Sequence, residues 1–138
     1  DPEYAEFRHG LYARLGEQGW QGAEGAKLLT TFAEEAGKEA AARRERLRWG
    51  VGFLVDLFRQ TLHAVGGGPA AEDDDLQRAA ERLARQVPAD LETWAAVVDR
   101  CLDALGQIER NAHPTTLVDG LADDVERLLT RSNQVVWL

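Results

Sequence analysis

The strongest structural signal in this chain is a helical hairpin predicted over residues 90–129. Apolar residues recur there at intervals of three and four, which places them on one face of an α-helix and not of a β-strand. A second stripe of Leu and Val follows over residues 117–129. The face of the first helix comprises Leu91, Trp94, Ala95, Val98, Leu102, Leu105 and Ile108.

The turn of this hairpin carries residues that suit the end of one helix and the start of another. Asp90 can cap the first helix through its carboxylate. Asn111 tolerates the left-handed backbone that ends many helices, and Pro114 suits the first turn of the next helix. His113 precedes that proline, so we interpret it as part of the helix entry. We therefore predict structural roles for Asn111, His113 and Pro114.

The rest of the chain also reads as helices separated by glycine and proline. Helical spacing predicts helices over 4–15, 23–36, 39–65 and 72–87, while alternating β patterns are scarce. Trp20 falls in the first loop, where we interpret it as a hydrophobic plug and not as a ligand-stacking residue. Residues 1–138 are thus predicted to form a single all-α bundle of five to six helices, with a long central helix and a C-terminal hairpin. The tail, 131–138, leaves the helical pattern and is expected to pack Trp137 or to fray.

The long third helix has two apolar rows instead of one. Its main row contains Leu47, Val51, Leu54, Val55, Phe58, Leu62 and Val65, and its second row contains Trp49, Phe53 and Leu57. Two rows predict a helix that is covered on two sides. Trp49, Phe53 and Leu57 are therefore candidates for a subunit interface, and the competing interpretation places both rows in the domain's own core.

Composition narrows the functional classes. A net charge of −8 argues against a free-standing nucleic-acid module, although the run 43–48 contains Arg43, Arg44, Arg46 and Arg48. We interpret that run as a solvated turn paired with Glu34, Glu35 and Glu45, and contact with an acidic partner or with nucleic acid is the alternative. The single cysteine, Cys101, indicates a core or interface residue in a reducing, cytoplasmic compartment. No apolar run is long enough to span a membrane.

Motifs for catalysis, cofactors and metals were sought without success. His9, His63 and His113 are scattered, and the acidic run 72–75 lacks the spacing of a calcium loop. The sequence contains no phosphate-binding loop, dinucleotide fingerprint or nucleophile elbow. We therefore expect no catalytic site, no cofactor and no metal, and interpret the chain as a scaffold or interaction module.

Two segments resemble bacterial clamp-loader subunits. Residues 101–121, CLDALGQIERNAHPTTLVDGL, resemble the last helices of that family, with His113 where the family commonly has Asn. Residues 34–48, EEAGKEAAARRERLR, lead into 53–59, FLVDLFR, and are similar to the delta prime branch of the family. Together these matches cover about half of the chain. A gamma/tau subunit is the alternative within the family.

The resemblance implies the C-terminal collar domain, which joins clamp-loader subunits into a ring. It implies gamma/tau and delta subunits as partners, with the sliding clamp and primer-template DNA reached only through the whole complex. The ATPase-like and lid modules of that family precede the collar and their motifs do not occur here, so we expect a fragment of a longer chain. An unrelated helical adaptor is the alternative from a different class. A nucleic-acid-binding helical domain that uses Lys38 and the run 43–48 is a third.

Overall fold

The computed structural model describes the backbone of residues 1–135 and the side chains of residues 1–131, and over that range its regular secondary structure consists of helices alone. Six helices follow one another: α1 (Pro2–Gln18), α2 (Gly22–Glu34), α3 (Ala40–Gly66), α4 (Asp74–Gln86), α5 (Leu91–Glu109) and α6 (Pro114–Val135). The prediction of an all-α bundle of five to six helices with a long third helix is confirmed. Helix α6 continues to Val135, so the expected break at residue 131 is wrong, while Trp137 lies outside the described residues.

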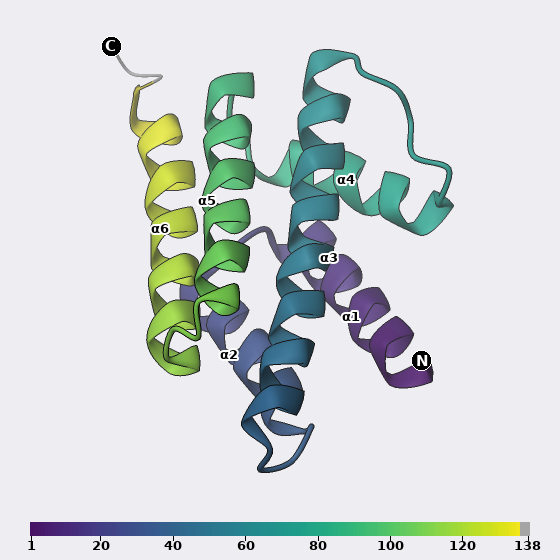
Figure 1. The fold of residues 1–138 in the computed structure, drawn as a ribbon. Helices are drawn as coiled ribbons and strands as arrows, with labels where there is room; N and C mark the ends of the chain where they lie inside the picture. Colours follow the sequence, from purple (N-terminus) through teal and green to yellow (C-terminus); the bar gives the residue numbers. More distant parts are fainter. Residues whose placement is uncertain (136–138) are drawn as a thin grey trace.

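The helices form two layers. In Figure 1, α3, α5 and α6 run side by side, and α1, α2 and α4 lie obliquely behind them. Helix α3 packs against α5, α4 and α2, while α6 packs against α5 and α2. The two helices that begin the chain do not pair with each other, because α1 packs mainly on α4 and α2 on α6 and α3. Helix α3 is therefore the central element.

The helix ends have the local chemistry that the sequence predicts. The Asp90 carboxylate accepts a hydrogen bond from the backbone N–H of Thr93 at 2.8 Å, and the Asp73 carboxylate accepts from Asp75 and Leu76. These bonds satisfy amides that a helix start leaves without a partner. Gly67 ends α3 in the left-handed conformation with φ 77°. The starts of α4 and α5 and the end of α3 thus follow local capping.

One contiguous core joins all six helices. It includes Leu11 on α1, Leu29 on α2, Leu83 on α4 and Leu121 on α6, all of which are fully buried. Helix α3 contributes the largest share, because its Leu47, Val51, Leu54, Val55, Leu57 and Phe58 are all buried. Burial of apolar surface on this scale is the main stabilising term of the fold.

Trp20 anchors the loop between α1 and α2 to helix α6. Its indole N–H donates a hydrogen bond to the backbone carbonyl of Ala122 on α6 at 3.1 Å, and its ring meets Phe58 edge-on at 5.9 Å between centroids. Gly25 passes so close to the ring that a Cβ there would overlap it. The interpretation of Trp20 as a hydrophobic plug is confirmed.

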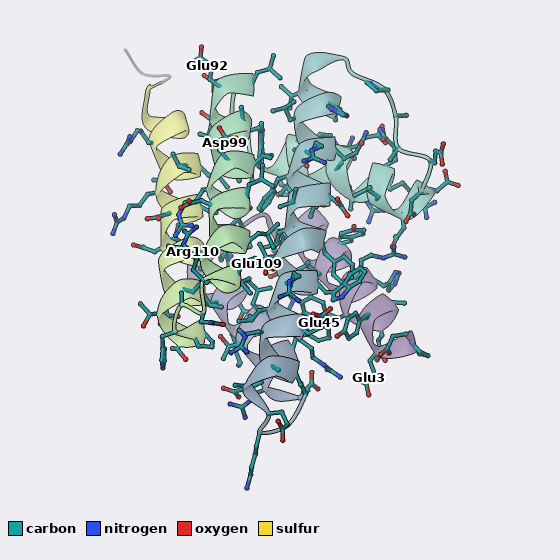
Figure 2. All side chains as sticks on the ribbon, in the orientation of Figure 1. Glu3, Glu45, Glu92, Asp99, Glu109 and Arg110 are labelled. Atoms are coloured by element: carbon teal, nitrogen blue, oxygen red, sulfur yellow. The ribbon has the colours of Figure 1, made fainter. Side chains whose placement is uncertain are left out.

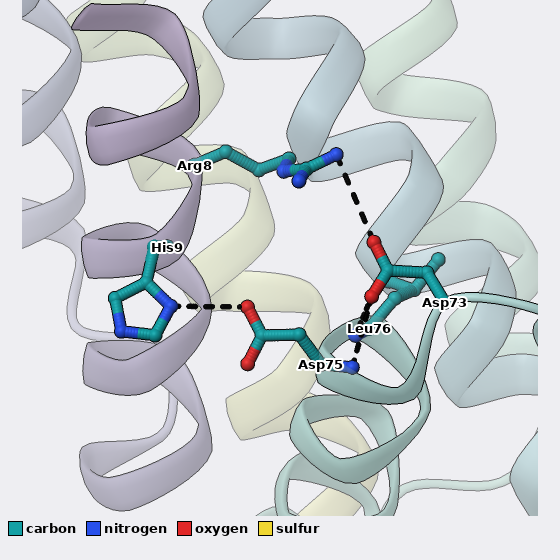
Figure 3. A network of polar contacts seen from close by, with 5 residues as sticks. All are labelled: Arg8, His9, Asp73, Asp75 and Leu76. Atoms are coloured by element: carbon teal, nitrogen blue, oxygen red, sulfur yellow. Dashed lines mark hydrogen bonds and ion pairs between the residues drawn. The ribbon is translucent and has the colours of Figure 1, made fainter. Parts of the chain in front are cut away.

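A polar network joins α1 to the start of α4 (Figure 3). The Arg8 guanidinium lies 3.7 Å from the Asp73 carboxylate, and His9 Nδ1 lies 3.1 Å from an oxygen of Asp75. Asp73 also caps α4, so one carboxylate serves both the helix end and the contact between helices. Both pairs are partly exposed and therefore orient α1 on α4 more than they stabilise it.

Candidate protein-binding face

The second apolar row of α3 divides between core and surface. Leu57 is fully buried and Phe53 is 8% exposed, whereas Trp49 is 48% exposed. Leu57 therefore has no surface with which to contact another subunit, because α3 turns it into the domain's own core. The candidate interface of Trp49, Phe53 and Leu57 is thereby narrowed to Trp49, with Phe53 at its edge. Trp49 is held by its own helix, since its indole N–H donates to the Glu45 carboxylate at 3.0 Å.

Helix α5 also carries two apolar rows. The buried row comprises Trp94, Val97, Val98, Cys101, Ala104 and Ile108. Leu91 and Leu102, which the sequence placed on the inward face, are 45% and 42% exposed, and Ala95 is also exposed. The prediction is wrong for these three residues because both rows repeat at helical spacing and lie next to each other on the helix. Periodicity alone does not say which of two adjacent rows is covered.

The outer row of α5 runs along α3, which borders it with Trp49 and Gly52 at one end and with Gly66 at the other. Near the end of α5, Leu105 lines a shallow groove of about 380 Å³ together with Trp49 and Gly52 of α3. At the other end of α5, the side chain of Leu91 lies against Gly66 of α3. We call this surface the α3/α5 face and define it by Trp49, Gly52, Leu91, Ala95, Leu102 and Leu105.

Gly52 lowers the surface of the α3/α5 face next to Trp49. It lies in the middle of α3, where glycine costs about 0.5–1 kcal/mol relative to alanine. A Cβ at this position would meet no atom within 4 Å, so the packing of the domain does not require glycine here. Gly50, two residues earlier, differs because a Cβ there would lie 2.9 Å from Leu29. The pair of glycines in α3 was the sequence signal that could have revealed this surface.

Acidic residues border the α3/α5 face. Figure 2 shows Glu45 on α3 and Glu92, Asp99 and Glu109 on α5. Arg48 bridges the two helices, because its guanidinium donates to Glu45 and, at 2.7 Å, to Glu109. Glu92 and Asp99 have no ion-pair partner among the side chains that the structure describes. The face is thus an apolar strip with a border that is acidic on the α5 side.

Asp56, which also lines the groove, is a carboxylate under partial desolvation. Burial raises the pKa of Asp56 above its ordinary value, and the nearby guanidinium groups of Arg59 and Arg8 oppose that shift. A cationic side chain brought to this position by a partner would favour the ionised carboxylate.

Three of the four arginines in the basic run 43–48 are engaged within the domain. Arg46 pairs with Glu3 and lies 4.8 Å from the centroid of the Phe32 ring, and Arg48 pairs with Glu45 and Glu109. Arg43 donates to the backbone carbonyl of Gly37. Glu45 is thus a partner as predicted, while Glu3 of α1 and Glu109 of α5 take the places expected for Glu34 and Glu35. These contacts reduce the positive charge that this run could offer to a phosphate backbone.

The predicted turn residues take the roles that the sequence assigned to them. Asn111 adopts φ 61°, His113 precedes the helix and accepts the Leu117 N–H through its backbone carbonyl at 2.9 Å, and α6 begins at Pro114. Cys101 is fully buried, and burial raises the pKa of its thiol to about 12. This thiol therefore remains protonated at neutral pH.

Within the described residues there is no cluster of three or more His, Cys, Asp or Glu side chains that could hold a metal ion. None of the described helices combines the length and apolar character needed to cross a membrane. Comparisons with protein-family models, with curated proteins and with solved structures gave no match. The resemblance to clamp-loader subunits accordingly stays a prediction.

Proposed function

We propose that this chain is a non-catalytic subunit-assembly domain of the bacterial clamp-loader type, similar to the collar of the delta prime subunit of DNA polymerase III. The α3/α5 face is the surface through which it would contact a neighbouring subunit. The observation that carries the proposal is an apolar strip on two packed helices with Trp49 exposed at one end. Exposed tryptophan beside aliphatic side chains is typical of the centre of protein interfaces.

The border of the face indicates the chemistry of the partner. Glu92 and Asp99 flank the outer row of α5, and Asp56 lines the groove beside Gly52. A partner helix with an apolar stripe and flanking Lys or Arg would complement both features. The low surface at Gly52 would admit a large side chain or the backbone of that helix.

The proposed role places this domain in a heteromeric ring with gamma/tau and delta subunits in the cytoplasm. It would help to load the sliding clamp during DNA replication, and it would reach the clamp and primer-template DNA only through the whole complex. The sequence offers no catalytic motif, so catalysis would belong to other modules of the parent protein and its partners.

Co-expression with the gamma/tau and delta subunits of the same organism tests the proposal. The tagged chain should capture a heteromeric complex whose composition mass measurement reveals. Trp49→Asp and Gly52→Arg should each weaken capture by about tenfold or more, as expected at the centre of an interface. Phe53→Asp is a poor probe because Phe53 is largely buried.

Thr130→Arg is the control, because Thr130 is an exposed residue of α6, which takes no part in this face. All variants should keep the helical circular dichroism of the parent chain. A folded chain that enters no complex with clamp-loader subunits would contradict the proposed assembly role and favour an unrelated helical adaptor. A complex in which the chain takes the place of gamma/tau would favour that branch of the family.

A further inference from the structure

A second surface lies between α1 and α2, separate from the α3/α5 face. The two helices diverge from the loop that Trp20 fixes, because α1 packs on α4 while α2 packs on α6 and α3. A groove of about 630 Å³ opens between them. We call it the α1/α2 groove, and its lining comprises Glu3, Glu6, Phe7, Gly10, Leu11, Arg14, Leu28, Phe32, Glu35 and Arg46. It shares no lining residue with the groove beside Trp49.

The α1/α2 groove has an apolar part among its charged walls. Phe7 and Phe32 stack face to face with 4.0 Å between ring centroids and 6° between planes. Phe7 and Leu28 are half-buried although each already packs against the core. Their remaining apolar area faces the groove, since both line it. An apolar side chain seated there would remove this area from water.

Gly10 lies on the α1 wall of the groove and has no packing reason within the domain. A Cβ at this position would meet no atom within 4 Å. The residue is in the middle of α1, where glycine costs about 0.5–1 kcal/mol relative to alanine. Close approach of another chain to the helix backbone is the use to which such a glycine is suited.

Charges on the walls define what the occupant must carry. Arg46 pairs with Glu3, and Arg14 pairs with Glu24 at 2.7 Å. Glu6 on α1 and Glu35 at the end of α2 have no ion-pair partner among the described side chains. Lys27 on α2 lines the adjoining part of this hollow together with Phe7, Leu28 and Glu35, and it too has no ion-pair partner among the described side chains. The two unpaired acids outnumber this one lysine, so the uncompensated charge is negative.

We propose that the α1/α2 groove is a docking site for a peptide segment of another protein that presents apolar side chains next to Lys or Arg. The apolar side chains contact Phe7 and Leu28, and the cationic groups reach Glu6 and Glu35. The backbone of the segment passes Gly10. This site does not depend on the role proposed for the α3/α5 face, because the two surfaces are lined by different residues.

Two synthetic peptides of about 15 residues, the length at which isolated helices become marginally stable, test the proposal on the whole chain. One has a Leu stripe flanked by Lys, and the other has the same stripe flanked by Glu. Amide resonances are followed by two-dimensional NMR during titration. The Lys peptide should shift the amides of Phe7, Gly10 and Leu28, and the Glu peptide should not bind.

Variants separate docking in the groove from general attraction to a chain of net charge −8. Gly10→Trp should lower the affinity for the Lys peptide by about tenfold or more, because the new side chain fills the groove. The double variant Glu6→Gln, Glu35→Gln should weaken it by about two- to fivefold, as expected for two exposed ion pairs. Thr130→Trp, at an exposed position of α6 that lines neither surface, should leave the peptide-induced shifts of Phe7, Gly10 and Leu28 unchanged.

Three results would overturn the proposal. They are equal binding of the two peptides, shifts that map to α3 and α5 instead of α1 and α2, and unchanged affinity in Gly10→Trp. Absence of binding by the Lys peptide would count equally against it. Circular dichroism verifies the fold of each variant, and the double glutamine variant, which alters exposed side chains alone, carries the same test if Gly10→Trp does not fold.

Discussion

At the scale of single residues, the glycines within helices fall into two physical classes. Gly25 and Gly50 are approached by side chains of neighbouring elements, so that a Cβ would collide with Trp20 or Leu29. Gly10 and Gly52 face open space. The first class is explained by the packing of the domain, whereas the second class is costly to helix stability and gains nothing from internal packing. That asymmetry is the residue-level basis for both proposed surfaces.

Substitution by alanine should separate the two classes. Gly25→Ala is expected to lower the free energy of unfolding by about 1–3 kcal/mol, because the new methyl group would displace the hydrogen-bonded Trp20 ring. Gly10→Ala is expected to raise it by about 0.5–1 kcal/mol through helix propensity. Urea unfolding followed by circular dichroism measures both. Equal stability of Gly25→Ala and the parent chain would contradict this prediction, because it would mean that the Trp20 ring can move aside at little cost in free energy.

Asn111 and Trp49 show what a sequence can and cannot reveal about single residues. The left-handed conformation of Asn111 could be predicted, because its cause is local: an Asn between two helical segments, shortly before a proline. The exposure of Trp49 could not be separated from the burial of Leu57, eight residues later on the same row. That difference depends on which helices cover each end of α3, and spacing along α3 carries no information about its neighbours.

At the scale of helices, the sequence predicts where each helix lies and where it ends. It does not predict which face of a helix is covered by its neighbours. Predicted and observed helices agree to within a few residues, because caps and breakers act locally. Helix α5 has adjacent apolar rows, of which the one with Trp94 and Cys101 is covered and the one with Leu91 and Leu102 is exposed. The choice between them is made by the position of α3 and α6, so the outer row could be recognised only in the folded chain.

The start of α5 offers a test of helix capping through pH. Hydrogen bonding by the Thr93 side chain and its backbone N–H lowers the pKa of Asp90 below the ordinary value of 3.8. A lowered pKa in the folded state means that Asp90 stabilises the fold above about pH 4, and that this contribution is lost as the pH falls through the folded-state value. Asp90→Asn keeps a capping oxygen but does not titrate.

Urea unfolding at pH 6 and at pH 3 measures this effect. The loss of stability on acidification should be smaller in Asp90→Asn than in the parent chain, since one of its pH-dependent contributions is gone. Asp90→Ala serves as a control that lacks the cap at both pH values and should be less stable than Asp90→Asn at each. The same pH dependence in Asp90→Asn and the parent would contradict the prediction.

At the scale of the whole molecule, the pairing of helices is the part of the fold that the sequence left open. Neighbours in sequence pair at the end of the chain, where α5 packs on α6, but α1 and α2 separate to pack on α4 and α6. The short loop at Trp20 would equally allow a hairpin. The long-range contact of Trp20 with Ala122, 102 residues away, holds this loop against α6, and the α1/α2 groove lies between the two helices that the loop connects.

Since one core joins all six helices, the described chain should unfold as a single cooperative unit. Leu121→Ala removes a fully buried side chain from α6 and is expected to cost about 2–5 kcal/mol. Leu102→Ala, at an exposed position of the α3/α5 face, should change stability by less than about 0.5 kcal/mol while weakening capture of a partner.

In Leu121→Ala, hydrogen exchange in α1 and α4 should accelerate together with exchange in α5 and α6. If α1 and α4 instead kept the protection of the parent chain, the bundle would consist of two separately stable parts, and its long-range contacts would be weaker than the continuous core implies.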